Sequence, residues 1–237
     1  MRSDGQRALS WGYVGRIEYD RAEALQRRLR EEVRRGERPD VLLLLEHPPV
    51  YTLGRSASRA EILLPDEELE RRGITVAECD RGGQVTYHGP GQLVGYPILD
   101  LNPDRRDVRR YVRNLQAVLV ATLERLGINA EGRMEQPEIG VWVGEKKIGS
   151  IGVHLARWIT THGFALNVST DLAMFGGIVA CGMPSVEMTS IEVLTGTKPS
   201  LEEVASICAA AFGRVFHSSL TTLDLSLEEE ERWASVS

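Results

Sequence analysis

The chain has few cysteines and no long apolar run. Its three cysteines, Cys79, Cys181 and Cys208, form no CxxC pair, which argues against a disulfide scaffold and a thiolate zinc site. The longest apolar run, residues 41–45, is far shorter than the ~20 residues of a membrane helix. Residues 1–11 lack the apolar stretch of a secretory signal. We therefore expect a cytoplasmic protein that does not bind membranes.

Lysine is the scarcest charged residue. Of the 28 Lys and Arg residues only Lys146, Lys147 and Lys198 are lysines, which leaves 25 arginines, and the net charge is −6. This acidic balance argues against a nucleic-acid-binding protein. The arginine-rich stretch of residues 16–38 interleaves with glutamates on a predicted amphipathic helix, which indicates a solvated, ion-paired face.

Helical and strand-like segments alternate along the chain. Helices are predicted from Asp20 to Gly36, after Pro65, from Asp107 to Gly127 and from Ser200. Strands are predicted at residues 41–45, 74–79 and 93–101, with hairpins at 141–155 and 148–168. This mixture favours an α+β layer architecture. We expect one catalytic domain over residues 1–220 and an acidic tail over 221–237.

A glycine-rich segment, residues 81–92, is predicted to form a loop that approaches a ligand. Glycines at 82, 83, 89 and 91 permit tight turns and close backbone contact, and Pro90 stiffens the turn. Its pattern matches neither nucleotide-binding fingerprint. A structural turn between two strands is the alternative interpretation.

Cys181 is the best candidate nucleophile among the three cysteines. Cys208 lies on the apolar stripe of the last predicted helix and Cys79 in a strand-like run, so both are expected to be structural. Cys181 lies in a loop between glycine and proline residues, which suits a presented thiol. His88 and His162, both in glycine-bearing segments, are candidate bases for it.

The paired lysines are the other candidate bases. Arginine stays protonated at any working pH, whereas a lysine in a suitable environment exchanges its proton. Lys146 and Lys147 are adjacent in a predicted strand, so their side chains point to opposite faces and one can enter a site. In the alternative interpretation, both lysines are solvated residues of a hairpin.

Several segments together resemble the bacterial octanoyltransferases of lipoate biosynthesis. The resemblance covers residues 46–54, 81–92 with 96–101, 147–153, 162–167 and 181–182 with 189–190, in this order. It implies the biotin/lipoate protein ligase-like catalytic fold, a mixed, largely antiparallel sheet flanked by helices. Gly149 and Met188 depart from the family pattern, where alanine and valine are expected.

The resemblance also implies a set of site residues. Cys181 matches the acyl-accepting cysteine, and Lys147 rather than Lys146 matches the catalytic lysine. The residues that would line the acyl pocket are Arg81, Gly82, Gly83, Gln84, Val85, Thr86, Tyr87, His88, Ser150, Ile151, Gly152, Gly163, Phe164 and Ala165.

The implied reaction needs neither a cofactor nor a metal ion. An octanoyl group passes from octanoyl-acyl carrier protein to Cys181 as a thioester. It then passes to a lysine amine of lipoyl domains, in the E2 subunits of pyruvate and 2-oxoglutarate dehydrogenases or in the glycine cleavage H protein. Backbone N–H groups near Cys181 are expected to stabilise the oxyanion. A monomer is expected.

Three alternatives follow from the same residues. An ATP-dependent lipoate–protein ligase on the same fold would need ATP and no cysteine nucleophile. A non-catalytic protein that binds acyl carrier protein or acyl chains would form no covalent adduct. A cysteine hydrolase that uses Cys181 with His162 would release free acid.

Overall fold

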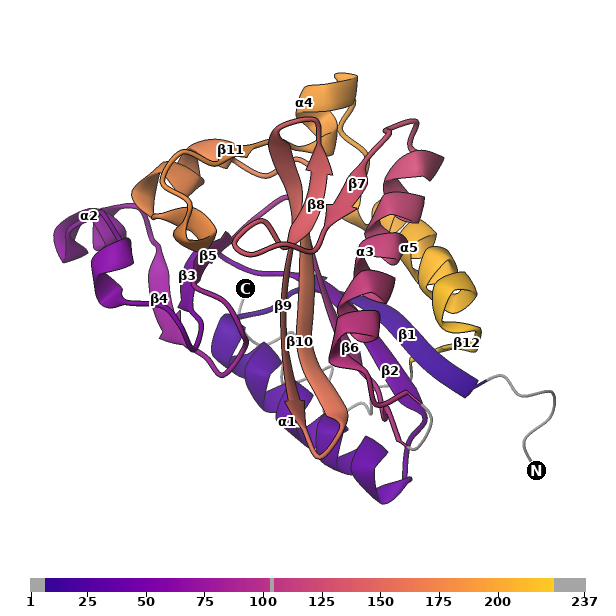
Figure 1. Ribbon diagram of the computed structural model, residues 1–237. Helices are drawn as coiled ribbons and strands as arrows, with labels where there is room; N and C mark the ends of the chain where they lie inside the picture. The colour runs from indigo at the N-terminus through magenta and orange to yellow at the C-terminus, as the bar shows by residue number, and fades with distance from the viewer. Residues whose placement is uncertain (1–6, 103–104, 224–237) are drawn as a thin grey trace.

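A computed structural model describes residues 7–102 and 105–223. The described chain forms a nine-stranded sheet, a three-stranded sheet and helices packed on them (Figure 1). No helix in these two ranges is long and apolar enough to cross a membrane. The predicted acidic tail falls largely on residues 224–237, outside the described ranges, and residues 218–222 form the last strand.

The nine-stranded sheet is mixed and largely antiparallel, as predicted. Its strand order is β12-β1-β2-β6-β10-β9-β8-β7, with β11 paired to β9. Only the β1–β12, β1–β2 and β9–β11 pairs are parallel. The strands are β1 (Arg7–Arg16), β2 (Asp40–Glu46), β6 (Gln92–Ile98), β7 (Glu131–Arg133), β8 (Gly140–Val143), β9 (Lys146–Ala156), β10 (Ile159–Asn167), β11 (Glu187–Met188) and β12 (Ser218–Thr222).

Helices cover both faces of this sheet. The helices and short 3-10 segments are α1 (Tyr19–Arg35), η1 (Arg59–Glu61), α2 (Asp66–Arg71), α3 (Val108–Arg125), η2 (Leu172–Gly177), η3 (Ala180–Gly182), α4 (Ile191–Thr195) and α5 (Leu201–Phe216). In β2 the side chains alternate: Leu42 and Leu44 pack with α3 and α5, whereas Leu43 and Leu45 pack with α1. The run of leucines is therefore buried on both faces.

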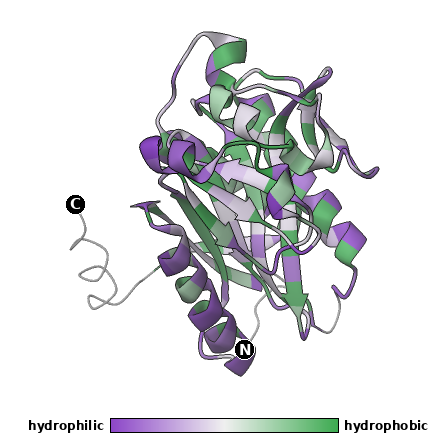
Figure 2. Cartoon of the chain, turned by 90° about the vertical axis from the view of Figure 1, so that its left-hand side faces the viewer, coloured by the Kyte–Doolittle hydropathy of each residue, from purple (hydrophilic) through white to green (hydrophobic). Residues whose placement is uncertain are grey.

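The ends of α1 show where the sequence patterns were right and wrong. The helix begins at Tyr19, with Glu18 as an N-cap that makes no side-chain hydrogen bond, so the predicted start at Asp20 was wrong. The predicted C-terminal stop is confirmed, because Gly36 adopts the left-handed conformation (φ +72°) that favours glycine. Figure 2 shows polar outer segments alternating with apolar ones along this helix.

The predicted starts of the other two long helices are confirmed. The Asp107 side chain accepts a hydrogen bond from the backbone N–H of Arg110 at the start of α3. Ser200 accepts one from the N–H of Glu203 at the start of α5. Each side chain satisfies a backbone donor that the helix itself leaves free.

The smaller sheet, β4-β3-β5, stands beside the main sheet (Figure 1). Its strands are β3 (Val50–Leu53), β4 (Thr75–Glu78) and β5 (Val85–His88). Residues 85–88 were predicted as part of a loop, so β5 is a correction: glycines flank a strand that pairs antiparallel with β3. A separate apolar cluster, which includes Tyr51, Tyr87 and Phe175, packs this sheet against η2 and η3.

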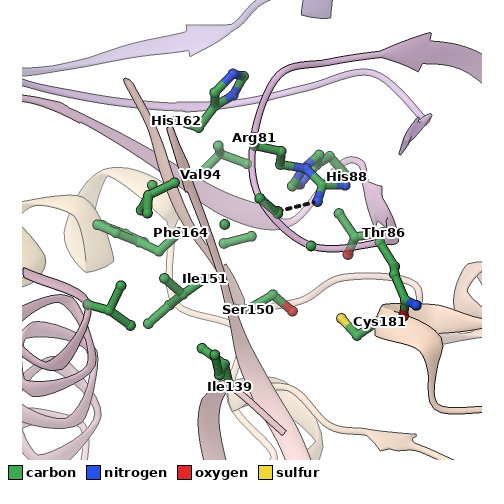
Figure 3. A pocket seen from close by; sticks show the side chains of 18 of the residues that line it. Arg81, Thr86, His88, Val94, Ile139, Ser150, Ile151, His162, Phe164 and Cys181 are labelled. Atoms are coloured by element: carbon green, nitrogen blue, oxygen red, sulfur yellow. Dashed lines mark hydrogen bonds between the residues drawn. The ribbon is translucent and has the colours of Figure 1, made fainter. Parts of the chain in front are cut away.

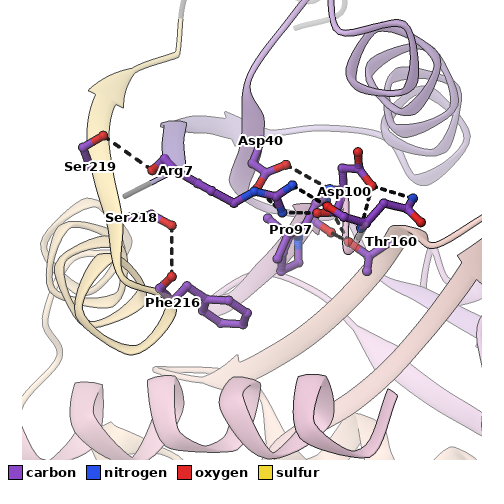
Figure 4. Close-up of polar contacts among 10 residues, drawn as sticks. Arg7, Asp40, Pro97, Asp100, Thr160, Phe216, Ser218 and Ser219 are labelled. Carbon is purple, nitrogen blue, oxygen red and sulfur yellow. Dashed lines mark hydrogen bonds and ion pairs between the residues drawn. The ribbon is translucent and has the colours of Figure 1, made fainter. Parts of the chain in front are cut away.

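Polar contacts join β1 to the neighbouring chain segments (Figure 4). Arg7 donates to the carbonyls of Asp100 and Asn102 and lies 3.7 Å from the carboxylate of Asp40. Asp40 in turn accepts a hydrogen bond of 2.9 Å from the backbone N–H of Asp100. Arg7 and Asp40 thereby tie the starts of β1 and β2 to the segment that follows β6.

Candidate active site

A cavity of about 460 Å³ lies where β9 and β10 meet the segment of residues 81–88 and η3 (Figure 3). The residues that line it are Tyr19, Ser56, Arg81, Gly82, Gly83, Gln84, Thr86, His88, Val94, Tyr96, Val112, Gln136, Pro137, Ile139, Lys147, Ser150, Ile151, Gly152, Val153, His162, Gly163, Phe164, Ala165 and Cys181. Both halves of the chain thus build one pocket.

All but two of the predicted site residues line this cavity. Val85 and Tyr87 do not, because residues 85–88 form a strand whose side chains alternate. Thr86 and His88 face the cavity, while Val85 and Tyr87 are buried in the core of the small sheet. The prediction treated these residues as a loop, for which no alternation is expected.

The thiol of Cys181 lies on a strained turn at one end of the cavity. Cys181 is half-buried and has a left-handed backbone (φ +53°, ψ +24°) within η3. A non-glycine residue in this region costs about 1–3 kcal/mol, and such strain concentrates at functional sites. Gly182, which follows, also has positive φ (+70°), and the Gln84 amide occupies the space where its Cβ would lie. The turn therefore presents the sulfur to the pocket.

Lys147 is the side chain that meets this thiol. Its Nζ donates a hydrogen bond of 3.5 Å to Cys181 Sγ. The side chain is almost fully buried, with 1% exposed, and its Nζ lies 5.6 Å from the centre of the Trp142 ring. Within the described ranges, no carboxylate forms an ion pair with it. The Cys181 sulfur is therefore the hydrogen-bond acceptor that the structure gives for the Lys147 side chain.

The two paired lysines point to opposite sides of β9, as the strand alternation predicts. Lys146 is exposed and forms a 3.0 Å ion pair with Glu187. The interpretation in which both lysines are solvated is therefore wrong for Lys147.

The backbone of Lys147 is fixed by the neighbouring strand. Met188 in β11 pairs with Lys147, and the N–H of Thr189 donates to the Lys147 carbonyl at 2.9 Å. Asn167 donates from its side chain to the Thr189 carbonyl at 3.0 Å. Asn167, the last residue of β10, thereby helps to hold the β11 segment against β9, which fixes the backbone of Lys147.

Gly140 leaves room for the Lys147 side chain, so its replacement by alanine is expected to lower activity. A Cβ at residue 140 would lie 2.6 Å from Lys147 Cε and 2.5 Å from the Gly149 carbonyl. Because a shift of about 1 Å at a catalytic group costs up to ~100-fold in rate, we expect kcat of Gly140→Ala to fall at least about tenfold in steady-state assays. Gly176→Ala, where a Cβ meets nothing within 4 Å, is the matched control. Equal activity of the two variants would contradict this assignment.

An apolar wall of the cavity lies across from Thr86 and Cys181 (Figure 3). Val94, Ile151 and Phe164 contribute to this wall. The Phe164 ring lies over Gly95 of the paired strand β6, where a Cβ would lie 2.2 Å from the ring. Glycine at residue 95 thus allows the aromatic ring to form part of the wall.

Arg81 holds the pocket segment to the small sheet. Its guanidinium is buried and donates to the Thr52 carbonyl at 2.7 Å and to the Thr52 hydroxyl at 2.8 Å. Gly82 donates from its N–H to the Val153 carbonyl at 2.9 Å. The segment of residues 81–88 therefore connects the small sheet to β9. Arg81 both lines the cavity and anchors this segment to β3.

The two histidines considered as bases for Cys181 have other partners. His88 Nδ1 is hydrogen-bonded to Gln92 Oε1 at 2.7 Å. His162 Nε2 is hydrogen-bonded to Asp80 Oδ1 at 2.7 Å, and its ring lies at the other end of the cavity from Cys181 (Figure 3). Among the described residues, Lys147 alone makes a hydrogen bond with the Cys181 thiol.

A second polar group lies behind His88. His47, which is fully buried, bonds the Ile17 carbonyl at 2.6 Å and the Tyr96 hydroxyl at 2.7 Å. Burial lowers the pKa of His47 to about 4 and that of His88 to about 3, so both rings are neutral at pH 7. The sequence did not single out His47, Tyr19 or Tyr96.

These two histidines predict that the folded state is destabilised in acid. In the unfolded chain their pKa values are near 6.5, so below that pH the unfolded chain binds more protons. Their stabilisation is complete above pH 6.5 and is lost progressively as the pH falls from 6.5 through the folded-state pKa values of about 4 and about 3, at a cost of about 3 kcal/mol for His47. We expect urea unfolding to show a falling free energy of unfolding from pH 7 to about pH 4.5.

Asp40 opposes this trend and supplies the control. Burial raises its pKa to about 6, so its stabilisation is complete below its ordinary pKa and is lost as the pH rises through 6. Asp40→Asn removes this opposing contribution, so the loss of stability toward acid is expected to become steeper. A free energy of unfolding that stays constant or increases toward acid would contradict the assignment of neutral buried histidines.

The two departures from the family pattern lie outside the cavity. A Cβ at Gly149 would meet Leu119 at 3.1 Å and Val141 at 3.3 Å, on the side of the sheet that faces α3. Met188 packs against the core of the small sheet. Neither residue lines the pocket, so neither changes its walls directly.

Comparison with known proteins decides the family. A sequence model described as lipoyl protein ligase A/B catalytic domain matches residues 18–213. The chain belongs to this family. A relative named octanoyltransferase from Solibacter usitatus is 52% identical over 86% of this chain and 90% of its own length. Another of that name, from Caldicellulosiruptor bescii, is 46% identical over 89% and 92%. The member described here is therefore an acyltransferase.

Solved structures support the fold. A lipoate-protein ligase A bound with ATP matches with a TM-score of 0.75 and 19% identity, over 95% of this chain and 92% of that one. A bipartite lipoate protein ligase from Thermoplasma acidophilum matches with a TM-score of 0.72 and 20% identity, over 95% and 89%. The predicted α+β ligase-like fold is confirmed.

Proposed function

We propose that this protein transfers an octanoyl group from octanoyl-acyl carrier protein to a lysine of lipoyl domains through a thioester on Cys181. The observation that carries the proposal is the 3.5 Å contact between Lys147 Nζ and Cys181 Sγ at the end of a partly apolar cavity. The pairing of a thiol with a lysine suits acyl transfer, since the two side chains supply a nucleophile and a proton acceptor. Relatives named octanoyltransferase at up to 52% identity support the same acyl group.

In the first half-reaction Lys147 takes the proton of the Cys181 thiol. The thiolate attacks the carbonyl carbon of the acyl thioester, and the bond between that carbon and the carrier's sulfur breaks. The released carrier thiolate is protonated by the Lys147 ammonium. The octanoyl group is then held on Cys181, with its chain along Ile151 and Phe164.

In the second half-reaction the amine of the acceptor lysine attacks the acyl carbon. Lys147, neutral after the first step, takes the proton that this amine loses, and the Cys181 sulfur leaves. Cys181 is then reprotonated from Lys147, which restores the resting pair. One lysine thus serves both steps, and the proton count closes without a cofactor or a metal ion.

The oxyanion of each step needs a hydrogen-bond donor near Cys181, and two of the backbone N–H groups expected from the sequence have other partners. The N–H of Gly182 donates to the Val179 carbonyl at 3.1 Å and that of Met183 to the Ala180 carbonyl at 3.0 Å. Both are thus engaged inside the turn. The amide of Gln84, which lies against Gly182, is our candidate donor.

The partners follow from the same chemistry. We propose acyl carrier protein as donor, with lipoyl domains and the glycine cleavage H protein as acceptors. The Thermoplasma ligase of the same fold was studied with its E2 lipoyl domain, which supports an acceptor of that class. We further propose that the enzyme acts as a monomer in the cytoplasm, with residues 1–220 as the catalytic domain.

A transfer assay without ATP tests this function. The chain is incubated with octanoyl-acyl carrier protein and a lipoyl domain, and the mass of the lipoyl domain is followed. We expect one octanoyl group per lipoyl domain at the same rate with and without ATP, since the thioester donor is already activated. Acylation from free octanoate that requires ATP would instead indicate the ligase activity, and release of free octanoate would indicate a hydrolase.

A further inference from the structure

Three side chains that could hold a metal ion gather at the end of the cavity away from Cys181, and a fourth contacts one of them. Glu23 comes from α1, Asp80 from the segment between β4 and β5, and His162 from β10. One ligand atom from each of these three lies within 4.8 Å of the other two. His154, from β9, adds a fourth, since its Nε2 lies 3.5 Å from Asp80 Oδ2.

The backbone at His162 explains how two imidazoles reach the same carboxylate. In the β9–β10 pair His154 lies opposite Thr161, so regular alternation would turn His162 to the other face. His162 instead has a left-handed backbone, with φ of +55°. Its N–H is held by the Gln26 side chain at 2.7 Å, and its Nε2 meets Asp80 Oδ1 while His154 meets Oδ2.

The donor set matches a transition-metal dication rather than calcium or magnesium. Two carboxylates and two imidazoles are ligands that Zn²⁺ accepts in tetrahedral geometry, with bonds of about 2.0–2.2 Å. Asp80 is half-exposed, with 53% of its side chain accessible, and offers an entry path from solvent.

The charges around the cluster set the strength of such a site. Arg30 and Arg81 act on the cluster from the neighbouring segments, and Arg27 pairs with Glu23 at 3.1 Å. These cations compete with a bound ion, so we expect weaker binding than in a dedicated structural zinc site. The two carboxylates balance the charge of one dication.

We propose that Glu23, Asp80, His154 and His162 bind one divalent transition-metal ion of the Zn²⁺ class. A tetrahedral ion would draw its ligand atoms to separations of about 3.4 Å. It would join α1, the β9–β10 hairpin and the segment that continues into Arg81 and Gly82, both of which line the acyl cavity. The site is independent of the Cys181 chemistry, and its expected effect is to fix this wall of the cavity.

Metal binding to the whole chain tests the proposal. The Cys181→Ala protein, which lacks the catalytic thiol, is dialysed against micromolar Zn²⁺, and bound zinc is counted by elemental mass spectrometry. We expect one ion per chain, and a melting temperature that rises with zinc. Co²⁺ in place of Zn²⁺ is expected to show the visible bands of a tetrahedral nitrogen–oxygen site without a thiolate charge-transfer band.

Single substitutions assign the ligands. We expect Asp80→Asn and Glu23→Gln each to weaken binding at least about tenfold, while Glu78→Gln, an exposed carboxylate two residues from Asp80, leaves it unchanged. His154→Gln provides a second imidazole test if His162→Gln fails to fold. Absence of stoichiometric zinc, unchanged affinity in Asp80→Asn, or a thiolate band that places the ion at Cys79 would each overturn the proposal.

Discussion

Cys181→Ala is expected to reduce octanoyl transfer to below detection and to leave no hydroxylamine-labile acyl group on the protein. The alanine side chain cannot attack a thioester carbonyl, and the remaining pocket offers no replacement at the same place: within the described ranges, Lys147 makes its only side-chain hydrogen bond with the Cys181 thiol. The assay combines the rate of lipoyl-domain acylation with the intact mass of the enzyme.

The other two cysteines are the matched controls for this substitution. Cys208 is a fully buried residue of α5, and burial raises its pKa to about 12. Cys79 donates from its thiol to the Leu53 carbonyl at 3.3 Å and does not line the cavity. We expect Cys79→Ala to retain the acyl adduct. Loss of the adduct in Cys79→Ala, with retention in Cys181→Ala, would mean that the nucleophile is misassigned.

Lys147→Arg is expected to lower kcat by about 10²–10⁴-fold, the usual contribution of a proton-transfer group. The substitution retains the positive charge beside the Cys181 sulfur. It removes the ability to take and return a proton, because a guanidinium stays protonated at any working pH. The bulkier head group must also fit a position that is 1% exposed, between Trp142 and Gly140.

Lys146 is the matched control for Lys147, because the two side chains carry the same charge but lie on opposite sides of β9. Lys146 is exposed, and its ion pair with Glu187 is of the kind that contributes little to stability. Lys146→Arg is therefore expected to keep wild-type activity within about twofold, because surface substitutions usually change free energies by no more than about 0.5 kcal/mol. If Lys147→Arg kept comparable activity, proton transfer would have to be assigned to another group, and His88 would be tested next.

The sequence predicted those parts of the site that depend on local pattern. Strand alternation alone placed Lys146 and Lys147 on opposite faces, and the glycine and proline residues around Cys181 indicated a turn. The family resemblance then selected one lysine and one cysteine. The structure brings these two atoms to 3.5 Å across 34 residues of chain, a distance that no local pattern contains.

The parts that the sequence missed depend on register and on distant segments. Nothing local to Tyr19 or Val112 indicates that each helix turns this side chain toward the same cavity. Residues 85–88 contain alternating polar and apolar side chains, but the surrounding glycines favoured a loop, so Val85 and Tyr87 were placed in the pocket. The meeting of Asp80 with His162 depends on one residue with positive φ, which sequence patterns do not show.

The acyl-enzyme intermediate gives the most direct test of the cysteine–lysine mechanism. The wild-type chain is mixed with octanoyl-acyl carrier protein in the absence of an acceptor, and the intact protein and its peptides are weighed. We expect the mass to rise by one octanoyl group, located on the peptide that contains Cys181, removed by hydroxylamine and passed to a lipoyl domain added later. An octanoylated lipoyl domain formed without any such intermediate, or an adduct on another residue, would contradict the proposed cysteine–lysine mechanism.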